Sequence, residues 1–209
     1  MKQLILASQS PRRKSLLEQL GYKFAAQGAD IDESVYENEN AHDYVRRLAE
    51  EKAHAIFSRL SAEQQGKTVV IGSDTSVVVA GEILGKPRDE AECIKTLLRL
   101  ENCIHQVLTA IAAVSCQHAN ENNTLSKVIE TQVTFKALTV AEIKRYWQTG
   151  EPCDKAGSYA IQGIGGQFVT TIKGSYSAVV GLPLYETAQM LAEMGLPTPI
   201  QTPENNANN

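Results

Sequence analysis

The chain has 209 residues, of which 43 % are hydrophobic and 21 % charged, a composition typical of a globular domain and unlike that of disordered, collagen-like or membrane proteins. Its formal net charge of -4 argues against non-specific binding to a nucleic-acid backbone, because such binding needs a surplus of Lys and Arg on one face. Any phosphate that the protein binds must therefore meet a local group of cations.

The cysteines and the N-terminal segment indicate a cytoplasmic protein. The four cysteines show neither a C-x-x-C pair nor the spacing of a metal site, so we expect reduced thiols. In residues 1–14 a short apolar run precedes a cationic cluster, the reverse of a signal peptide, and no run approaches the roughly 18 apolar residues of a membrane span. We predict one α/β domain over 1–197 and a disordered, polar tail at 198–209.

The N-terminal part is expected to form a strand and two helices. A short buried strand is predicted at 4–7, followed by a helix with Ser10 as its N-cap, a proline at its first position and Gly21 at its end. Apolar residues at helical spacing predict a second, amphipathic helix at about 40–60, on which Lys52 lies.

The middle of the chain is rich in β-formers. A strand over 68–73 is expected to end at Asp74, and a second strand is expected at 76–80. Asp89 and Glu92 form a capping-box pattern at the start of a helix that reaches about residue 100. Further along, the sequence predicts a strand pair at 105–114 and 127–135 around a hairpin loop at 120–124, a helix capped by Thr139 and Glu142, tight turns among the five glycines between 157 and 174, and a last helix at about 184–194.

A candidate phosphate site lies at the start of the first helix. The segment 8–13 places Ser8, Ser10, Arg12 and Arg13 where a strand end meets free backbone N–H groups. Cations in a first helical turn oppose the helix dipole, which favours the reading that an anion normally occupies the site. A solvated basic patch on an ordinary capped helix is the alternative.

The candidate metal ligands are carboxylates. Asp30, Asp32 and Glu33 lie in one loop, and Asp74 follows a buried strand, where α/β proteins place ligands. Hard oxygen ligands suit Mg²⁺ or Mn²⁺, which hold substrate phosphates through one or two carboxylates. The alternatives are simple solvation for the loop acids and a capping or turn role for Asp74.

Further cations could neutralise a phosphoryl group, and other nucleotide-binding motifs are missing. Lys52 and Lys86, with Arg13, could surround the equatorial oxygens of a transferred phosphate, although each lysine alone is more often a surface residue. The four histidines lack zinc-hydrolase spacing, and neither a P-loop nor a dinucleotide-binding G-x-G-x-x-G motif is present. A zinc hydrolase, a P-loop kinase and a Rossmann dehydrogenase are therefore disfavoured.

Taken together, these segments resemble the Maf family of nucleotide pyrophosphatases over residues 4–194. This resemblance implies an elongated α/β fold with a long mixed central sheet flanked by helices, two lobes with a cleft, kinship with inosine triphosphate pyrophosphatases, and a homodimer. The motifs that carry it are Leu-Ala-Ser-Gln-Ser-Pro-Arg-Arg at 6–13, Asp-Ile-Asp-Glu at 30–33, Arg-Leu-Ala-Glu-Glu-Lys-Ala at 47–53, Gly-Ser-Asp-Thr at 72–75, Gly-Lys-Pro at 85–87, Asp-Lys-Ala-Gly at 154–157 and Val-Gly-Leu-Pro at 180–183.

The resemblance also implies a reaction and roles for single residues. The family uses a divalent metal, Mg²⁺ or Mn²⁺, and releases pyrophosphate and a nucleoside monophosphate from a nucleoside triphosphate. Whether the acidic residue at 74 acts as the base or as a metal ligand stays open. The matching residues are Asp74 as proton acceptor or metal ligand, Glu33 as metal-associated carboxylate, Arg13, Lys52 and Lys86 as phosphate-binding cations, and Ser8 in the same loop.

Three positions indicate the branch of the family. Arg12, Thr75 and Gln162 match the branch that acts on dTTP and UTP, whereas the 7-methyl-GTP branch has an aromatic residue, Gln and Glu there. A neutral Gln can donate and accept toward a pyrimidine, whereas Glu can only accept from guanine. The alternatives are a 7-methyl-GTP pyrophosphatase and a regulator of septum formation that acts by binding alone.

Overall fold

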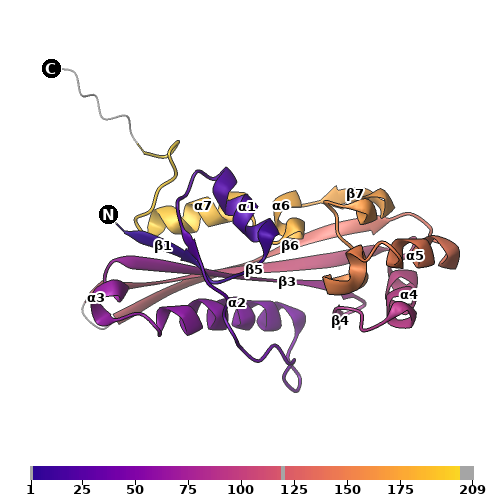
Figure 1. Ribbon diagram of the computed structural model, residues 1–209, viewed down its shortest axis with the longest axis horizontal. Coiled ribbons are helices and arrows are strands. Elements are labelled where there is room, and N and C mark those ends of the chain that lie inside the picture. Colours follow the sequence, from indigo (N-terminus) through magenta and orange to yellow (C-terminus); the bar gives the residue numbers. More distant parts are fainter. Residues whose placement is uncertain (1, 119–120, 203–209) are drawn as a thin grey trace.

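A mixed β-sheet runs along the longest axis of the computed structural model, which describes residues 2–118 and 121–202 (Figure 1). Its order is β2-β1-β3-β5-β6-β7, with β4 paired to β3. Strand β1 pairs in parallel with β2 and β3, and the remaining pairs are antiparallel. The strands are β1 (Gln3–Leu6), β2 (Ala25–Ala26), β3 (Thr68–Val79), β4 (Glu82–Leu84), β5 (Ile104–His118), β6 (Glu121–Phe135) and β7 (Val169–Lys173).

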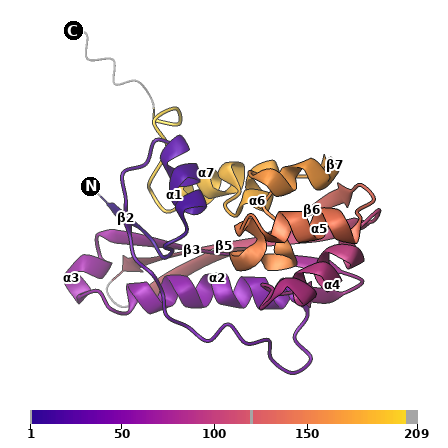
Figure 2. The same cartoon turned by 45° about the vertical axis from the view of Figure 1, so that its right-hand side comes forward.

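Helices cover both faces of this sheet. Helix α2 lies along one face, α1, α6 and α7 lie on the other, and α4 and α5 pack at the end where β7 lies (Figures 1 and 2). Short 3-10 turns connect α5 to β7. The helices are α1 (Pro11–Gln19), α2 (Ala41–Phe57), α3 (Ala62–Gln65), α4 (Glu90–Leu100), α5 (Val140–Trp147), α6 (Tyr176–Val180) and α7 (Leu184–Glu193), and the 3-10 turns are η1 (Glu151–Asp154), η2 (Ala156–Ser158) and η3 (Ile164–Phe168).

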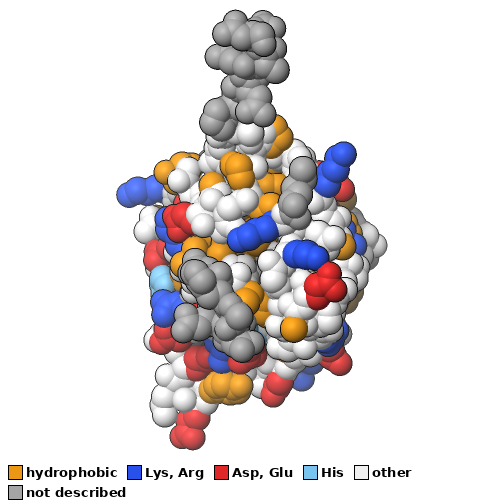
Figure 3. Space-filling model, turned by 90° about the vertical axis from the view of Figure 1, so that its left-hand side faces the viewer, with side chains coloured by type: hydrophobic (Ala, Val, Ile, Leu, Met, Phe, Trp, Pro, Cys, Tyr) orange, Lys and Arg blue, Asp and Glu red, His pale blue; other side chains and the backbone are white. Residues whose placement is uncertain are grey.

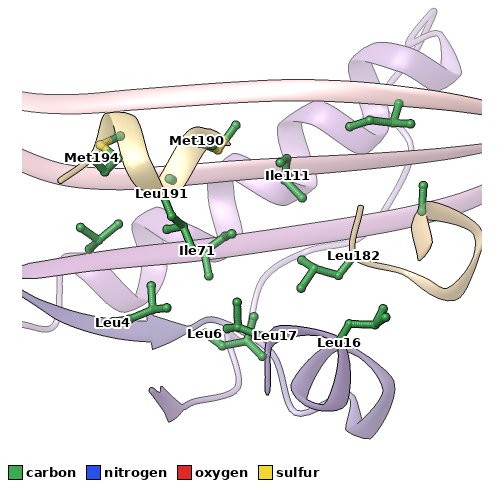
Figure 4. Packing of buried hydrophobic residues seen from close by; sticks show 14 of the residues in the cluster. Leu4, Leu6, Leu16, Leu17, Ile71, Ile111, Leu182, Met190, Leu191 and Met194 are labelled. Carbon is green, nitrogen blue, oxygen red and sulfur yellow. The ribbon is translucent and has the colours of Figure 1, made fainter. Parts of the chain in front are cut away.

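The two-residue period of β3 divides the core into two layers. Val69 and Ile71 pack with leucines of α1 and with the methionines in and directly after α7, and Figure 4 shows Ile71 among these side chains. Val70 and Val78 point to the opposite face and pack with residues of α2. Alternate strand residues point to opposite faces, so one apolar strand supplies both layers. The fold class predicted from the sequence is confirmed.

Glycine brings α2 close to the sheet at one point. A Cβ atom at Gly72 of β3 would collide with the backbone oxygen of Ala49 and would lie 2.9 Å from the backbone nitrogen of Ala53, both on α2. Only a residue without a side chain permits this approach. The contact fixes how the turn of α2 between these two alanines, which carries Lys52, lies over β3.

A second core cluster at the β7 end is built on aromatic rings. His105 is 1 % exposed and stacks edge-to-face on Phe135 and Tyr159, and Phe135 and Tyr146 contact Phe168. The Nε2 atom of His105 lies 2.9 Å from the hydroxyl of Tyr159. Burial lowers the pKa of His105 to about 4, so this ring is neutral at pH 7.

One prediction for the middle of the chain is wrong. The expected strands at 68–73 and 76–80 are one strand, β3, and Asp74 lies inside it, not where a strand leaves the core. Strand β5 pairs with β3 from Val69 to Val78, and this continuous partner holds the chain extended through Gly72 and Ser73. The glycine therefore marks a close helix approach and not a strand end.

The other side of β3 explains how an acid in mid-strand can still reach a site. Strand β1 pairs with β3 only as far as Ile71, and β4 pairs with it only from Val77 onward. Between these two partners, residues 72–76 have a sheet neighbour only in β5. This gap is a free edge in the middle of the sheet, and it takes the place of the predicted strand end.

Most other predicted elements are confirmed, with small shifts. The first helix begins at Pro11 after Ser10, although the Ser10 side chain makes no capping hydrogen bond. The second helix ends at Phe57, earlier than expected. Asp89 caps α4, while the Glu92 carboxylate bonds to Arg88 instead of completing the capping box. The capping box at Thr139 and Glu142 is complete, and the last helix lies where it was expected.

The hairpin predicted around 120–124 is wrong in extent. Residues 122–124 belong to β6 and pair with 114–116 of β5, so both strands are longer than predicted. Asn120 lies outside the described residues. Strand-to-strand pairing overrides the low β-propensity of the asparagines.

The surface and the C-terminal end bear on the remaining predictions. Figure 3 shows Lys, Arg, Asp and Glu side chains interspersed among hydrophobic ones on the face it displays. No helix within 2–118 and 121–202 is long and apolar enough to cross a membrane. Of the predicted tail, Thr198 is 3 % exposed and donates hydrogen bonds to Gln201, and residues 203–209 lie outside the described part of the chain.

Candidate active site

A cleft of about 470 Å³ opens at the free edge of β3. Elements from the whole chain reach it, including the start of α1, the loop before α2, the turn after β4 and the segment after α5. Of the residues predicted for the site, Ser8, Asp30 and Asp32 do not line this cleft. Those that do are Arg12, Arg13, Glu33, Lys52, Asp74, Thr75, Lys86 and Gln162.

Lys52 joins the two predicted acids. Its Nζ atom lies 2.6 Å from Oε1 of Glu33 and 2.8 Å from Oδ1 of Asp74. Lys52 and Asp74 are 8 % and 7 % exposed, whereas about half of the Glu33 side chain faces solvent. An ammonium between two carboxylates offsets their mutual repulsion in a poorly solvated place. The lysine therefore brings the two acids together at one place in the cleft.

The electrostatics keep Glu33 ionised. Partial burial acts to raise the pKa of Glu33, but the hydrogen bond from Lys52 and the positive charges of Lys52, Lys86 and Arg13 outweigh it, and the pKa is lowered. A charged Glu33 is available as an oxygen ligand at neutral pH.

The carboxylate pair fits a magnesium-type site. Lys52 uses one oxygen of Glu33 and one of Asp74, and the second oxygen of each could bind a hard cation. In the part of the chain that the structure describes, no three His, Cys, Asp or Glu side chains gather as a complete metal cage. Such an open set suits an ion that takes its remaining ligands from water and substrate phosphates.

Arg13 is held on the other face of β3. Its Nε atom donates to the carbonyl of Gly181 at 3.0 Å, and its two Nη atoms lie 3.5 Å from the hydroxyls of Ser8 and Thr75. The Gly181 carbonyl also accepts from Ser73 at 2.9 Å, which ties α6 to β3. Burial is the largest influence on the Arg13 guanidinium and lowers its pKa, against the opposing charge of Asp74.

Neighbouring residues of one strand thus serve one cleft from two sides. Asp74 points toward α2 and Thr75 toward α1, because consecutive strand residues face opposite ways. In the interior of a sheet these faces would be separated by the next strand. At the free edge of residues 72–76 a ligand can contact both.

The loop that carries Gln162 is anchored by a buried tyrosine and a glutamate. The Glu151 carboxylate accepts hydrogen bonds from the backbone N–H groups of Ile164 and Gly165, both at 2.9 Å, and from the hydroxyl of Tyr146 at 2.8 Å. That hydroxyl accepts in turn from the N–H of Ala160. These bonds hold the chain on both sides of Gln162, whose own side chain is exposed.

Several residues differ from the sequence-based picture. Ser8 is buried behind the cleft, where its hydroxyl accepts from Arg13 and from the N–H of Ser10. Asp32 caps its own turn by accepting from the N–H of Ser34, and neither it nor Asp30 lines the cleft. Ser8 therefore reaches the cleft only through its contact with Arg13, and the two aspartates lie outside the cleft.

The sequence reading missed three residues of the cleft. Tyr44 donates its hydroxyl to the backbone oxygen of Glu33, and Lys155 forms an ion pair with Asp154 at the cleft wall. Asp154 and Lys155 belong to the Asp-Lys-Ala-Gly motif at 154–157, for which the family resemblance implies no role of a single residue. Tyr44 lies two turns before Lys52 on α2, and the shared helix face was the available signal.

This fold and cleft define an α/β protein equipped to bind a polyphosphate beside a pair of carboxylates. The chain belongs to the family described as Maf-like protein, whose pattern it matches over residues 3–194. The family resemblance seen in the sequence is thereby confirmed.

Several curated proteins are similar to this chain over nearly all of its length. The dTTP/UTP pyrophosphatase of Colwellia psychrerythraea is 61 % identical over 96 % of this chain and 92 % of its own. The protein of the same name from Vibrio vulnificus is 52 % identical over 92 % of this chain and 99 % of its own. Among solved structures, the Staphylococcus aureus Ham1 protein covers 93 % of this chain and 100 % of its own, at 13 % identity and a TM-score of 0.46.

Proposed function

We propose that this protein is a nucleoside triphosphate pyrophosphatase that hydrolyses dTTP and UTP to the nucleoside monophosphate and pyrophosphate. The similar proteins from Colwellia and Vibrio carry the name of this activity. The observation that carries the proposal is the Glu33–Lys52–Asp74 group in one cleft with Arg13 and Lys86. Hydrolysis of a polyphosphate requires cations that neutralise the phosphate charge and, close to them, carboxylates that position a metal ion or the attacking water.

The reaction cleaves the bond between the α-phosphorus and the oxygen that bridges it to the β-phosphate. A water oxygen forms the new bond to the α-phosphorus, the bridging oxygen leaves with pyrophosphate, and the water gives up a proton. Asp74 is the acceptor that we assign to this proton, because its carboxylate is fixed by Lys52 at 2.8 Å. A fixed base orients the water in line with the leaving group.

The cations divide the work of binding the triphosphate. Arg13 is held rigidly by three protein oxygens and presents its guanidinium to the cleft, while Lys86 is exposed and free to follow the phosphates. Lys52 binds one oxygen of each carboxylate through its ammonium group. A Mg²⁺ or Mn²⁺ ion held by Glu33 would supply further positive charge to neutralise the substrate. In the alternative in which Asp74 is a metal ligand and not the base, Asp74 would hold this ion as well.

The base-recognition residues would be Arg12, Thr75 and Gln162. Gln162 can donate and accept toward the carbonyl and ring N–H of thymine or uracil, and the anchored loop limits where it can reach. Thr75 is already bonded to Thr109 at 3.1 Å, so its orientation is fixed. Discrimination among bases by such contacts amounts to about 1 to 3 kcal/mol for each group that is gained or lost.

The deciding experiment is pyrophosphate release from dTTP, UTP, CTP, GTP, 7-methyl-GTP and ITP with Mg²⁺ or Mn²⁺. We expect turnover of dTTP and UTP that needs the metal and falls about 10²- to 10⁴-fold in Asp74→Asn. Preference for 7-methyl-GTP would move the protein to the other branch. Absence of turnover with every nucleotide would favour the regulator of septum formation that acts by binding.

The homodimer remains a proposal that rests on the family resemblance. The cytoplasmic location remains a proposal that rests on the cysteine pattern and on the N-terminal segment. Light scattering of the purified protein measures the first, and cell fractionation measures the second. Neither is needed for the chemistry described above, because every residue assigned to the cleft comes from one chain.

A further inference from the structure

The loop that carries Glu33 has little structure of its own. We define the Glu33 loop as residues 27–40, between β2 and α2, and it contains neither a helix nor a strand. Most of its side chains are exposed, including Val35 and Tyr36, each about half exposed. Such a segment is expected to move unless it is held from outside. A carboxylate used for catalysis needs a fixed position.

One arginine of α2 supplies most of that hold. Arg47 binds the Glu39 carboxylate with two parallel hydrogen bonds, Nε to Oε1 at 2.6 Å and Nη2 to Oε2 at 2.7 Å. The same Nη2 donates to the backbone oxygen of Ser34 at 2.9 Å. The guanidinium therefore links Ser34 to Glu39, which lie on either side of the turn at 37–38.

The guanidinium is also enclosed by aromatic and acidic groups. Its central carbon lies 3.8 Å from the centre of the Tyr36 ring. Its Nη1 atom lies 3.4 Å from the carboxylate of Glu51, one helical turn further along α2. The side chains of Arg47 and Glu39 are only 16 % and 9 % exposed. Stacking and bidentate pairing in a poorly solvated place are stronger than ordinary surface contacts.

These contacts place the hold next to the proposed catalytic carboxylate. Tyr44 donates to the backbone oxygen of Glu33 at 2.9 Å, and Arg47 donates to the backbone oxygen of the next residue, Ser34. Lys52 then binds the carboxylate of Glu33 at 2.6 Å. Helix α2 therefore contacts the backbone of Glu33, the backbone of the next residue and the side chain of Glu33.

We propose that Arg47 is the positioning residue for Glu33, holding the Glu33 loop on α2 so that the carboxylate stays beside Lys52 and Asp74. Arg47 does not line the cleft and touches no reacting atom. The role of Glu33 in catalysis rests on the function proposed above, whereas the hold on the loop does not.

The planar fork of arginine is essential to this proposal. A lysine at position 47 keeps the charge but lacks the planar fork that pairs with both Glu39 oxygens in parallel and reaches the Ser34 carbonyl, and it stacks poorly on Tyr36. Arg47→Lys should therefore loosen the loop nearly as much as Arg47→Gln. The matched control is Arg46→Gln, because Arg46 is the adjacent residue, is about half exposed and, among the described residues, forms its ion pair with Asp43 of its own helix.

Hydrogen exchange tests the hold on the loop without any nucleotide. In Arg47→Lys and Arg47→Gln we expect amide exchange over residues 33–39 to be about tenfold faster than in the wild type, with β3 unchanged, and Arg46→Gln to exchange like the wild type. Equal exchange over 33–39 in all four proteins would overturn the proposal.

Kinetics test whether the hold acts through Glu33. With saturating Mg²⁺ and dTTP, Arg47→Gln should lower kcat about tenfold in the wild-type background and change it little in the Glu33→Gln background, since coupled residues are not additive. An equal loss in both backgrounds would show that Arg47 does not act through Glu33 and would overturn the assignment. Absence of any wild-type turnover would overturn the proposed function, while the exchange experiment would still decide the positioning role.

Discussion

The Nζ atom of Lys52 lies 2.8 Å from Oδ1 of Asp74, and both side chains are about nine-tenths buried. The lysine comes from α2 and the aspartate from the interior of β3. They meet because the helix crosses the strand closely at Gly72, two residues before the acid. The position of the cation over the proposed base is therefore set by the packing of one helix on one strand.

Removing the cation should harm both activity and stability. Lys52→Met leaves the Glu33 and Asp74 carboxylates facing each other without compensation, so we expect it to abolish turnover and to lower the free energy of unfolding by about 2 kcal/mol, less than for a fully buried pair because Glu33 is half exposed. Urea unfolding at pH 7.5 measures the second effect.

The double variant Lys52→Met, Asp74→Asn is the control for charge. Removing both members of the pair deletes the uncompensated buried carboxylate, so part of the stability should return while activity stays absent. A double variant as unstable as the sum of the two single variants would mean that Lys52 contributes by packing and not by charge.

The approach of α2 to β3 can be tested at Gly72. Gly72→Ala places a methyl group against the backbone of α2, and we expect a loss of about 1 to 3 kcal/mol of stability and a lower kcat, because the helix that carries Lys52 must move away. Gly66→Ala is the control, since its added Cβ meets its nearest neighbours at ordinary contact distance, 3.7 Å. Thermal unfolding and pyrophosphate release are measured for both variants. Equal losses of stability and of kcat in Gly72→Ala and Gly66→Ala would contradict this view.

Much of the site could be predicted because its residues stand in local patterns. Arg13 stands in the first turn of a helix that begins with a proline shortly after a strand, and Lys52 stands on an amphipathic helix, so the local pattern indicates both. That the predicted residues lie close together in one site was implied by the family resemblance and not by these local patterns. The spacing of residues along the chain does not by itself reveal that Gln162 and Arg13 line one cleft.

The sequence failed where long-range pairing decides the structure. A glycine and a serine before Asp74 look like the end of a strand, yet the partner strand β5 continues past them and keeps the chain extended. The free edge that replaces the strand end depends on where β1 stops and β4 begins, which no local signal in β3 reports. Likewise, the hold of Arg47 on Glu39 joins a loop to a helix through tertiary packing.

The anchored loop should control how the substrate is bound. Glu151→Gln keeps the size of the side chain but replaces one of the two oxygens that accept from Ile164 and Gly165. We expect KM for dTTP to rise severalfold, by about 1 kcal/mol of binding, with kcat little changed, because the loop carries Gln162 and not the carboxylates. Steady-state kinetics with dTTP and UTP measure this, and a fall in kcat at constant KM would contradict it.

The buried histidine predicts how stability depends on pH. The pKa of His105 falls from an ordinary 6.5 to about 4 on folding, because burial disfavours the charged ring. Between these values the unfolded chain binds a proton that the folded chain does not, so the free energy of unfolding should decrease as the pH is lowered from about 6.5 to about 4, by up to about 3 kcal/mol from this group.

The variant His105→Gln separates this effect from the titration of the carboxylates. Glutamine stays neutral and keeps a hydrogen-bonding group for the Tyr159 hydroxyl, which His105 contacts at 2.9 Å. The variant is expected to be less stable than the wild type at pH 7.5 because the ring packing is lost, yet to lose less stability between pH 6.5 and pH 4.5. Urea unfolding at both pH values measures the two slopes. Equal losses of stability in the variant and the wild type would show that His105 does not gain its charge on unfolding. The sensitivity to acid would then come from carboxylates whose pKa is lowered by folding, such as Glu33. The stability that such a carboxylate contributes is lost only as the pH falls through its pKa in the folded protein.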